Sequence, residues 1–209
     1  MTQQDQKLQR TVTGEPASHV ASLVERANSG EKGAFDQLVD MFQGDIFRMV
    51  YYRTRSQMDA EDITQDVFVQ AYKSLVRLKS PEQFRSWLFS IAVNKVRDFH
   101  RKGKFRALFG SYTEGEEDMG HGGEKDEDPD ALDTVMRKDF WKQVEMLLEK
   151  LSMMEREVFM LRFMDHLGIR EISSVLKKQE STVKTHLYRA LEKFRREPSM
   201  RELLREDIR

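Results

Sequence analysis

Apolar residues recur every three or four positions along most of the 209-residue chain, which is the period of an α-helix. The first such stretch runs from His19 to Gly30, a second covers residues 34–56, and a third begins at Asp59. The apolar positions of the second are Phe35, Leu38, Val39, Phe42, Ile46, Met49 and Val50, and those of the third are Ile63, Val67, Ala71 and Leu75. Each pattern predicts a helix with one buried face.

A fourth helix is predicted after an interruption at residues 79–84. Ser80 suits an N-cap, Pro81 suits the first turn, and Gln83 is placed to close a capping box with Ser80. We expect this helix to end at about Lys102.

Residues 103–132 have a different composition. The stretch "GSYTEGEEDMGHGGEKDEDPD" contains five glycines, and Gly110 to Asp133 holds ten acidic residues and one basic residue. So few apolar residues cannot bury a core, which predicts a flexible acidic linker and a domain boundary. His121 lies here without other ligands at metal-binding spacing, so we expect no metal site.

Helical periodicity resumes at Ala131 and includes "DFWKQVEMLLEKL". Ser152 and Glu155 predict a capping box, and "ISSVLKKQESTVKTHLYRALEKFRR" predicts two short helices joined by a tight turn. We therefore expect an all-α chain. It comprises a tail at 1–19, a helical bundle at 20–102, the linker at 103–132, a second bundle at 133–196, and a tail at 197–209 that is either a partner helix or a frayed end.

Composition narrows the class of protein. The chain has no cysteine, which excludes disulfides, thiolate metal sites and a cysteine nucleophile. Its start has no signal-peptide pattern, and its best apolar run, "WLFSIAV", is too short to span a membrane. The net charge of −1 conceals two basic blocks: Arg85 to Arg106 has seven bases and one acid, and Gly168 to Arg196 has eight bases and three acids. Such blocks suit a polyphosphate partner, although many are simply solvated helix faces.

The last predicted helix has two faces. Its apolar side holds Val183, Leu187, Ala190, Leu191 and Phe194, and its polar side holds Ser181, Lys184, Thr185, Tyr188, Arg189 and Glu192. These polar side chains suit base edges and phosphates in a DNA major groove, so we predict a helix-turn-helix; a plain helical hairpin is the alternative. The preceding helix supports it through Ile172, Val175 and Leu176. The turn "KKQE" lacks glycine, so we expect a Lys or Gln in the left-handed conformation.

The first basic block mixes aromatic and basic residues, a combination that stacks unpaired bases and follows a nucleic-acid backbone. The aromatics are Phe84, Trp87, Phe89 and Phe99, and for Trp87, Leu88 and Ile91 we favour a core position. The side chains of Asn94, Arg97, Asp98 and Arg101 predict one exposed polar ridge. On the third helix, Asp62, Gln65, Asp66 and Val69 lie opposite the apolar face. They indicate either favourable helix-dipole interactions or a protein partner.

Three motifs in this order resemble the bacterial sigma factors of RNA polymerase, in the extracytoplasmic-function (ECF) group of the sigma-70 family. They are "DAEDITQDVFVQAYKSL", "FRSWLFSIAVN" and the long stretch from "LSMMEREVF" to "LEKFRR". The resemblance covers Ala21–Lys102 and Asp133–Arg196. It implies sigma domain 2 at 20–102 and sigma domain 4 at 133–196, and an alternative sigma factor that binds core polymerase, recognises promoters and promotes DNA opening.

The resemblance also implies roles for individual residues. The resemblance implies that this chain docks on the clamp coiled coil of the polymerase β′ subunit. The residues implied for that contact are Asp62, Gln65, Asp66, Phe68 and Val69. Residues for the −10 element are Lys79, Ser80, Gln83, Phe84, Asn94, Arg97, Asp98, Arg101 and Lys102, with one base flipped into a pocket at the loop 79–84. Residues for the −35 element are Ser181, Thr182, Lys184, Thr185, Tyr188 and Arg189.

Other partners follow from the resemblance as well. It implies that the chain contacts the β flap of the polymerase, that its linker lies in the polymerase's RNA exit path, and that an anti-sigma factor binds it. It also implies a cytoplasmic protein with no catalytic residues, cofactor, metal or stable membrane insertion. Larger sigma factors carry tandem aromatics as a wedge on the melting helix, and the matching positions here are Ser90 and Ile91. With a weaker wedge, we expect opening to depend on capture of the flipped base, and hence a narrow promoter set.

Three other interpretations remain open at this point. A plain repressor or activator explains the last helices but not the acidic third helix, and it would need a dimer and a palindromic site. A helical nuclease or hydrolase is disfavoured by scattered histidines and by the lack of a phosphate-binding glycine loop, HExxH or GxSxG. For a helical adaptor with no DNA role, the behaviour of the protein towards DNA would not change with salt concentration.

Overall fold

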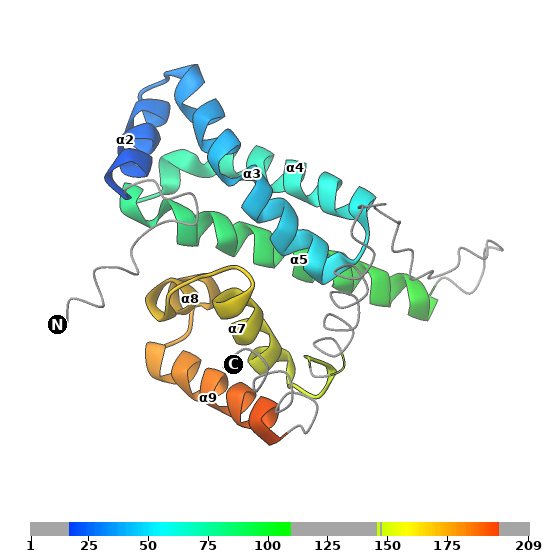
Figure 1. The fold of residues 1–209 in the computed structure, drawn as a ribbon. Helices are drawn as coiled ribbons and strands as arrows, with labels where there is room; N and C mark the ends of the chain where they lie inside the picture. The colour runs from blue at the N-terminus through cyan, green and yellow to red at the C-terminus, as the bar shows by residue number, and fades with distance from the viewer. Residues whose placement is uncertain (1–16, 110–145, 147, 197–209) are drawn as a thin grey trace, which may run out of the picture. The chain divides into compact units, whose positions relative to one another are not determined.

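The computed structural model describes residues 17–109, 146 and 148–196, and the regular elements in these ranges are helices (Figure 1). The elements are α2 (Ala17–Asn28), α3 (Lys32–Thr54), α4 (Gln57–Ser74), the 3₁₀ turns η2 (Leu75–Arg77) and η3 (Pro81–Gln83), α5 (Phe84–Phe109), α7 (Met153–Phe163), α8 (Ile169–Leu176) and α9 (Glu180–Arg196). They form two compact units, with α2 to α5 in the first and α7, the start of α8 and α9 in the second. The predicted all-α fold is confirmed for the described residues.

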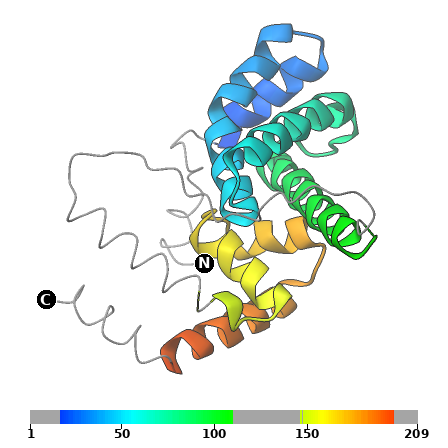
Figure 2. The same ribbon diagram turned by 90° about the vertical axis from the view of Figure 1, so that its right-hand side faces the viewer.

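In the first unit, α3 is the central helix and packs against α2, α4 and α5. Figures 1 and 2 both show α3 running alongside α4. The apolar positions predicted for these two helices are buried, except that Val39 is half-buried. The helical period therefore located the core of this unit correctly, because each helix buries one continuous stripe.

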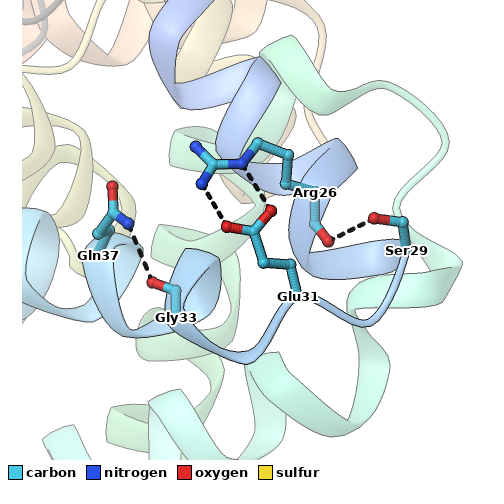
Figure 3. Close-up of polar contacts among 5 residues, drawn as sticks. All are labelled: Arg26, Ser29, Glu31, Gly33 and Gln37. Carbon is cyan, nitrogen blue, oxygen red and sulfur yellow. Dashed lines mark hydrogen bonds and ion pairs between the residues drawn. The ribbon is translucent and has the colours of Figure 1, made fainter.

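The corner between α2 and α3 is held by polar contacts (Figure 3). Gly30 has φ +95°, a conformation that favours glycine, and α2 ends at Asn28, two residues before it. The Arg26 guanidinium makes two contacts with the Glu31 carboxylate, one of them from Nε to Oε2 at 2.9 Å. The hydrogen bond from Arg26 lowers the pKa of Glu31 below its usual value. This pair joins the last turn of α2 to the residue that precedes α3.

Several helix ends differ from the prediction: α2 and α3 each begin and end two residues before the predicted stretches. α4 begins at Gln57 rather than Asp59, because the Ser56 hydroxyl caps it by accepting from the Asp59 backbone N–H at 3.3 Å. Ser80 precedes η3 with Pro81 in its first turn, but the side chain of Ser80 makes no cap hydrogen bond, so the predicted capping box is wrong. α5 continues to Phe109, so the predicted boundary at residue 103 falls within this helix.

In the second unit, α7 packs against α9, and the rings of Phe159 and Phe194 stack at a centroid distance of 4.4 Å. The predicted capping box at the start of α7 is confirmed. The Ser152 backbone N–H donates to the Glu155 carboxylate at 2.9 Å, and the Glu155 N–H donates to the Ser152 hydroxyl at 3.4 Å. The linker from residue 110, residues 139–145 and 147 of the predicted helix around Trp141, and residues 1–16 and 197–209 lie outside the described residues. The predicted N-terminal tail at 1–19 is wrong at its last three residues, because α2 begins at Ala17.

The turn between α8 and α9 contains a left-handed residue that is not glycine. Lys177 has φ +52°, as expected from the lack of glycine in "KKQE". A side chain in this conformation meets its own backbone, which costs about 1–2 kcal/mol.

We therefore expect Lys177→Gly to stabilise the second unit by about 0.5–1 kcal/mol, after allowance for the greater backbone entropy of glycine. Amide hydrogen exchange in α8 and α9 would measure the change. The control is Lys178→Gly, because Lys178 is not among the described residues with positive φ. Stabilisation of equal size in both variants would contradict the prediction.

Candidate functional site

The outer face of α4 carries an exposed stripe. Asp62, Gln65, Asp66 and Val69 are exposed, as predicted. Three further exposed apolar residues share this face: Met58 at 71% exposure, Tyr72 at 63%, and Val76 in η2 at 80%. We define the α4 stripe as Met58, Asp62, Gln65, Val69, Tyr72 and Val76. These positions alternate in steps of four and three, which is the spacing of a seam that packs against another helix. This spacing was visible in the sequence, but three of its members were not recognised there.

Phe68 does not belong to this exposed face. It is 8% exposed and buried in the first unit. Its neighbour Val69 is 44% exposed, and Asp66 is largely exposed as well. Phe68 therefore supports α4 from beneath, and the structure does not bring it to the surface with the other four predicted residues.

The predicted polar ridge on α5 is exposed. We define the α5 ridge as Asn94, Arg97, Asp98, Arg101 and Lys102, all of which are exposed. Within it, Arg101 and Asp98 form an ion pair at 3.0 Å. Because both side chains are more than half exposed, this pair contributes little to stability and can be exchanged for other partners.

The loop before α5 is only partly available to a ligand. Lys79 and Gln83 are exposed and Ser80 is half-buried, but Phe84 is completely buried. The Phe84 ring lies 5.5 Å from that of Phe42, between ring centroids. The ring is part of the core, so the structure does not bring Phe84 to the surface with the exposed residues of the loop, and its contact with DNA stays a prediction.

Aromatic and basic residues of α5 divide between core and surface. Phe89 and Leu88 are buried, whereas Trp87 and Ile91 are only half-buried rather than in the core as predicted. Arg85, which the sequence placed in a basic block, is 7% exposed, and its guanidinium lies 5.2 Å from the centre of the Phe89 ring. The basic surface of this helix is thus smaller than the count of bases suggested.

The outer face of α9 presents the predicted polar side chains. Ser181, Lys184, Thr185, Tyr188 and Arg189 are exposed, and we define them as the α9 face. Thr182 is half-buried. The apolar side is buried at Val183, Ala190 and Phe194 and half-buried at Leu187 and Leu191.

An ion pair between a buried carboxylate and a partly exposed ammonium holds the C-terminal end of α9. Lys193 Nζ donates to Glu155 Oε2 at 2.7 Å and to the Lys150 carbonyl at 3.3 Å. The Glu155 side chain is 7% exposed and that of Lys193 is 45% exposed. The hydrogen bond from Lys193 lowers the pKa of Glu155, against the opposing effect of burial. This pair connects the first turn of α7 to the last turn of α9.

The pKa shift predicts a pH dependence. Because the folded pKa of Glu155 lies below its usual value of 4.5, ionised Glu155 stabilises the fold above that value and loses this contribution as the pH falls through the folded pKa. We expect a loss of about 1 kcal/mol at low pH, since Lys193 is partly exposed. Amide hydrogen exchange in α7 and α9 between about pH 5 and pH 3 would measure it. In Glu155→Gln this loss of stability at low pH should be absent. An unchanged pH profile in that variant would show that Glu155 is not its source.

Two further observations concern other classes of site. Among the residues that the structure describes, no group of three or more His, Asp and Glu side chains is placed to hold a metal ion, and His121 lies outside them. Within the same residues, no helix is both long enough and apolar enough to cross a membrane.

Comparisons with known proteins agree with this architecture. The family model described as Sigma-70 region 2 matches residues 38–106, and that described as Sigma-70, region 4 matches residues 141–194. The ECF RNA polymerase sigma factor BldN of Streptomyces coelicolor is 30% identical, over 87% of this chain and 67% of BldN. The RNA polymerase sigma factor CnrH of Cupriavidus metallidurans is 30% identical, over 82% of this chain and 90% of CnrH. The solved structure of CnrH with the cytosolic domain of CnrY matches with a TM-score of 0.60 and 25% identity, over 90% of this chain and 99% of CnrH.

Regions 2 and 4 in this order define a subunit that gives RNA polymerase its promoter specificity. The chain belongs to the sigma-70 family, in the ECF group of RNA polymerase sigma factors. It acts in transcription initiation by directing core RNA polymerase to promoters and promoting DNA opening.

Proposed function

We propose that the two units divide this function among three surfaces. The α4 stripe docks on the clamp coiled coil of the polymerase β′ subunit. The α5 ridge and the exposed residues of the loop 79–84 hold the non-template strand of the −10 element. The α9 face recognises the −35 element as duplex DNA.

The observation that carries the proposal is the contrast between two helices of the first unit. The α4 stripe combines apolar and acidic or amide side chains, which suits a protein partner and repels DNA. The α5 ridge is net basic and polar, which suits a nucleic-acid strand. Because the stripe has heptad-like spacing, a helical partner fits it better than a flat surface does.

DNA opening on these surfaces needs no catalytic group. It follows from a higher affinity for the unpaired strand than for the duplex, which shifts the equilibrium toward the open form. Each well-placed base contact contributes about 1–3 kcal/mol of discrimination. The half-buried Trp87 and Ile91 lie beside the α5 ridge on the same helix and add apolar surface there.

The proposal extends to two further partners. Exposed Met153 and Phe163 on α7, at 81% and 44%, provide apolar surface for contact of the second unit with the β flap. CnrH is solved bound to the cytosolic domain of CnrY. By analogy, an anti-sigma factor holds this chain inactive in the cytoplasm.

The experiment that tests the function combines the purified protein with bacterial core polymerase on fragmented genomic DNA of its source and maps transcript starts. We expect discrete starts, each preceded by two short shared motifs at fixed spacing. The absence of starts, together with no co-elution with core polymerase, would overturn the proposal.

Asn94→Ala is expected to leave polymerase binding intact and to reduce opening about tenfold, which corresponds to one lost base contact. Permanganate footprinting of the transcription bubble measures this effect. The control is His100→Ala, because His100 is exposed on the same helix but lies off the α5 ridge. A normal bubble with Asn94→Ala would exclude Asn94 from the −10 contact.

A further inference from the structure

One ion pair connects the two helices that carry the proposed interfaces of the first unit. Lys95 Nζ on α5 lies 2.9 Å from Asp66 Oδ2 on α4. The Asp66 side chain is 64% exposed and the Lys95 side chain is 31% exposed. The pair is therefore accessible from outside, and a competing partner can replace either member.

Lys95 lies at the edge of the α5 ridge. It follows Asn94 in the sequence and is three residues before Asp98, a spacing that makes Lys95 and Asp98 neighbours on the helix surface. The Asp98 carboxylate is already paired with Arg101 at 3.0 Å. The Lys95 ammonium is paired instead with Asp66, which faces it from α4.

Asp66 lies at the edge of the α4 stripe. It follows Gln65 by one residue and precedes Val69 by three, so it borders the surface proposed for the polymerase. A partner that docks there and offers a cation or hydrogen-bond donor competes with Lys95 for the Asp66 carboxylate. Because exposed ion pairs change equilibria by about fivefold at most, such a competitor can displace Lys95 readily.

We propose that Lys95 is a further DNA-contacting residue, one that Asp66 holds in the free protein and that polymerase docking on α4 releases to a phosphate of the −10 strand. This inference rests on the proposed roles of α4 and α5. The coupling is reciprocal, since DNA that engages Lys95 also frees Asp66 for the polymerase. It gives the free protein a weaker grip on the strand than the polymerase-bound protein has.

The first test uses the free protein and a fluorescent oligothymidylate strand, because a phosphate contact does not depend on base sequence. Asp66→Asn should tighten binding about threefold and steepen the salt dependence by about 0.7, the value for one phosphate on a single strand. The matched control is Asp62→Asn, which removes the same charge from an exposed position on the same helix. Adding Lys95→Met to Asp66→Asn should abolish the gain.

Two outcomes would overturn the inference. One is an equal gain in Asp66→Asn and Asp62→Asn, which would indicate only a general loss of negative charge. The other is a gain that survives Lys95→Met. If the Lys95–Asp66 pair only stabilised the packing of α4 on α5, Asp66→Asn and Lys95→Met would each lower the unfolding midpoint. Neither would then change the salt dependence of strand binding.

The second test compares the free and polymerase-bound states. Lys95→Met should weaken binding of the same strand about threefold in the complex with core polymerase and by less in the free protein, where Asp66 competes for the Lys95 ammonium. If the wild-type chain fails to bind core polymerase, the proposed function fails. If it binds but Lys95→Met has equal effects in both states, the proposed function stands and the release of Lys95 is refuted.

Discussion

Phe84→Ala is expected to lower the free energy of unfolding of the first unit by about 3–5 kcal/mol, which is the usual cost of removing a buried phenylalanine ring. Phe84 is completely buried, and its ring packs against those of Phe42 and Trp87 at centroid distances of 5.5 and 5.8 Å. Urea unfolding followed by Trp87 fluorescence measures the change. Trp141→Phe in the background removes the other tryptophan.

The control for this experiment is Lys79→Ala in the same loop. Lys79 is exposed, so its removal should change the free energy of unfolding by no more than about 0.5 kcal/mol. It should instead weaken DNA opening, if the loop contacts the −10 strand. Equal unfolding midpoints for Phe84→Ala and Lys79→Ala would contradict a core role for Phe84.

Val69→Glu is expected to weaken binding of core polymerase about 30-fold, or about 2 kcal/mol, as for a central residue of an interface. Val69 is 44% exposed at the middle of the α4 stripe, where a helical partner would bury it. Because the glutamate would be buried without a partner, binding loses both the apolar contact and the solvation of the charge. An anisotropy titration of labelled protein with core polymerase measures this affinity.

Gln70→Glu provides the matched control. Gln70 is exposed and adjacent, but it lies about 100° around the helix from Val69 and so off the stripe. The added charge is the same, and binding should change little. A similar loss in both variants would mean that net charge, rather than the stripe, governs association.

The fold of the first unit follows closely from its sequence. α3 and α4 are amphipathic, so helical periodicity identified their buried residues almost completely. Helix ends were harder to predict. Ser56 and Ser80 both have the side chain of an N-cap, yet only Ser56 forms the side-chain bond. At Ser80 the following 3₁₀ turn directs the Gln83 N–H to the Ser80 carbonyl at 2.9 Å instead.

Family motifs located the candidate surfaces but not which side chains reach them. Phe68 and Phe84 fall within the matched motifs, and both are buried. Arg85 contributes to the count of bases, although its guanidinium lies against a ring in the core. At the margin of an apolar face, exposure depends on which neighbouring helix packs there, and the pattern of a single helix does not contain that information. In contrast, the exposure of Tyr72 and Val76 could have been predicted from the sequence, because both positions continue the steps of three and four residues that define the α4 stripe.

The Glu155–Lys193 pair has a mechanical consequence for promoter recognition. Lys193 lies twelve residues beyond Ser181 on α9, which corresponds to about 18 Å along a helix. Over such a lever arm, a tilt of about 5° at the anchored end displaces the other end by about 1.5 Å. That displacement is half the length of a hydrogen bond, so base contacts would fail while the helix itself stays folded. If the α9 face recognises the −35 element as proposed, acidification through the folded pKa of Glu155, which lies below 4.5, is expected to blunt discrimination among −35 sequences before it unfolds the second unit.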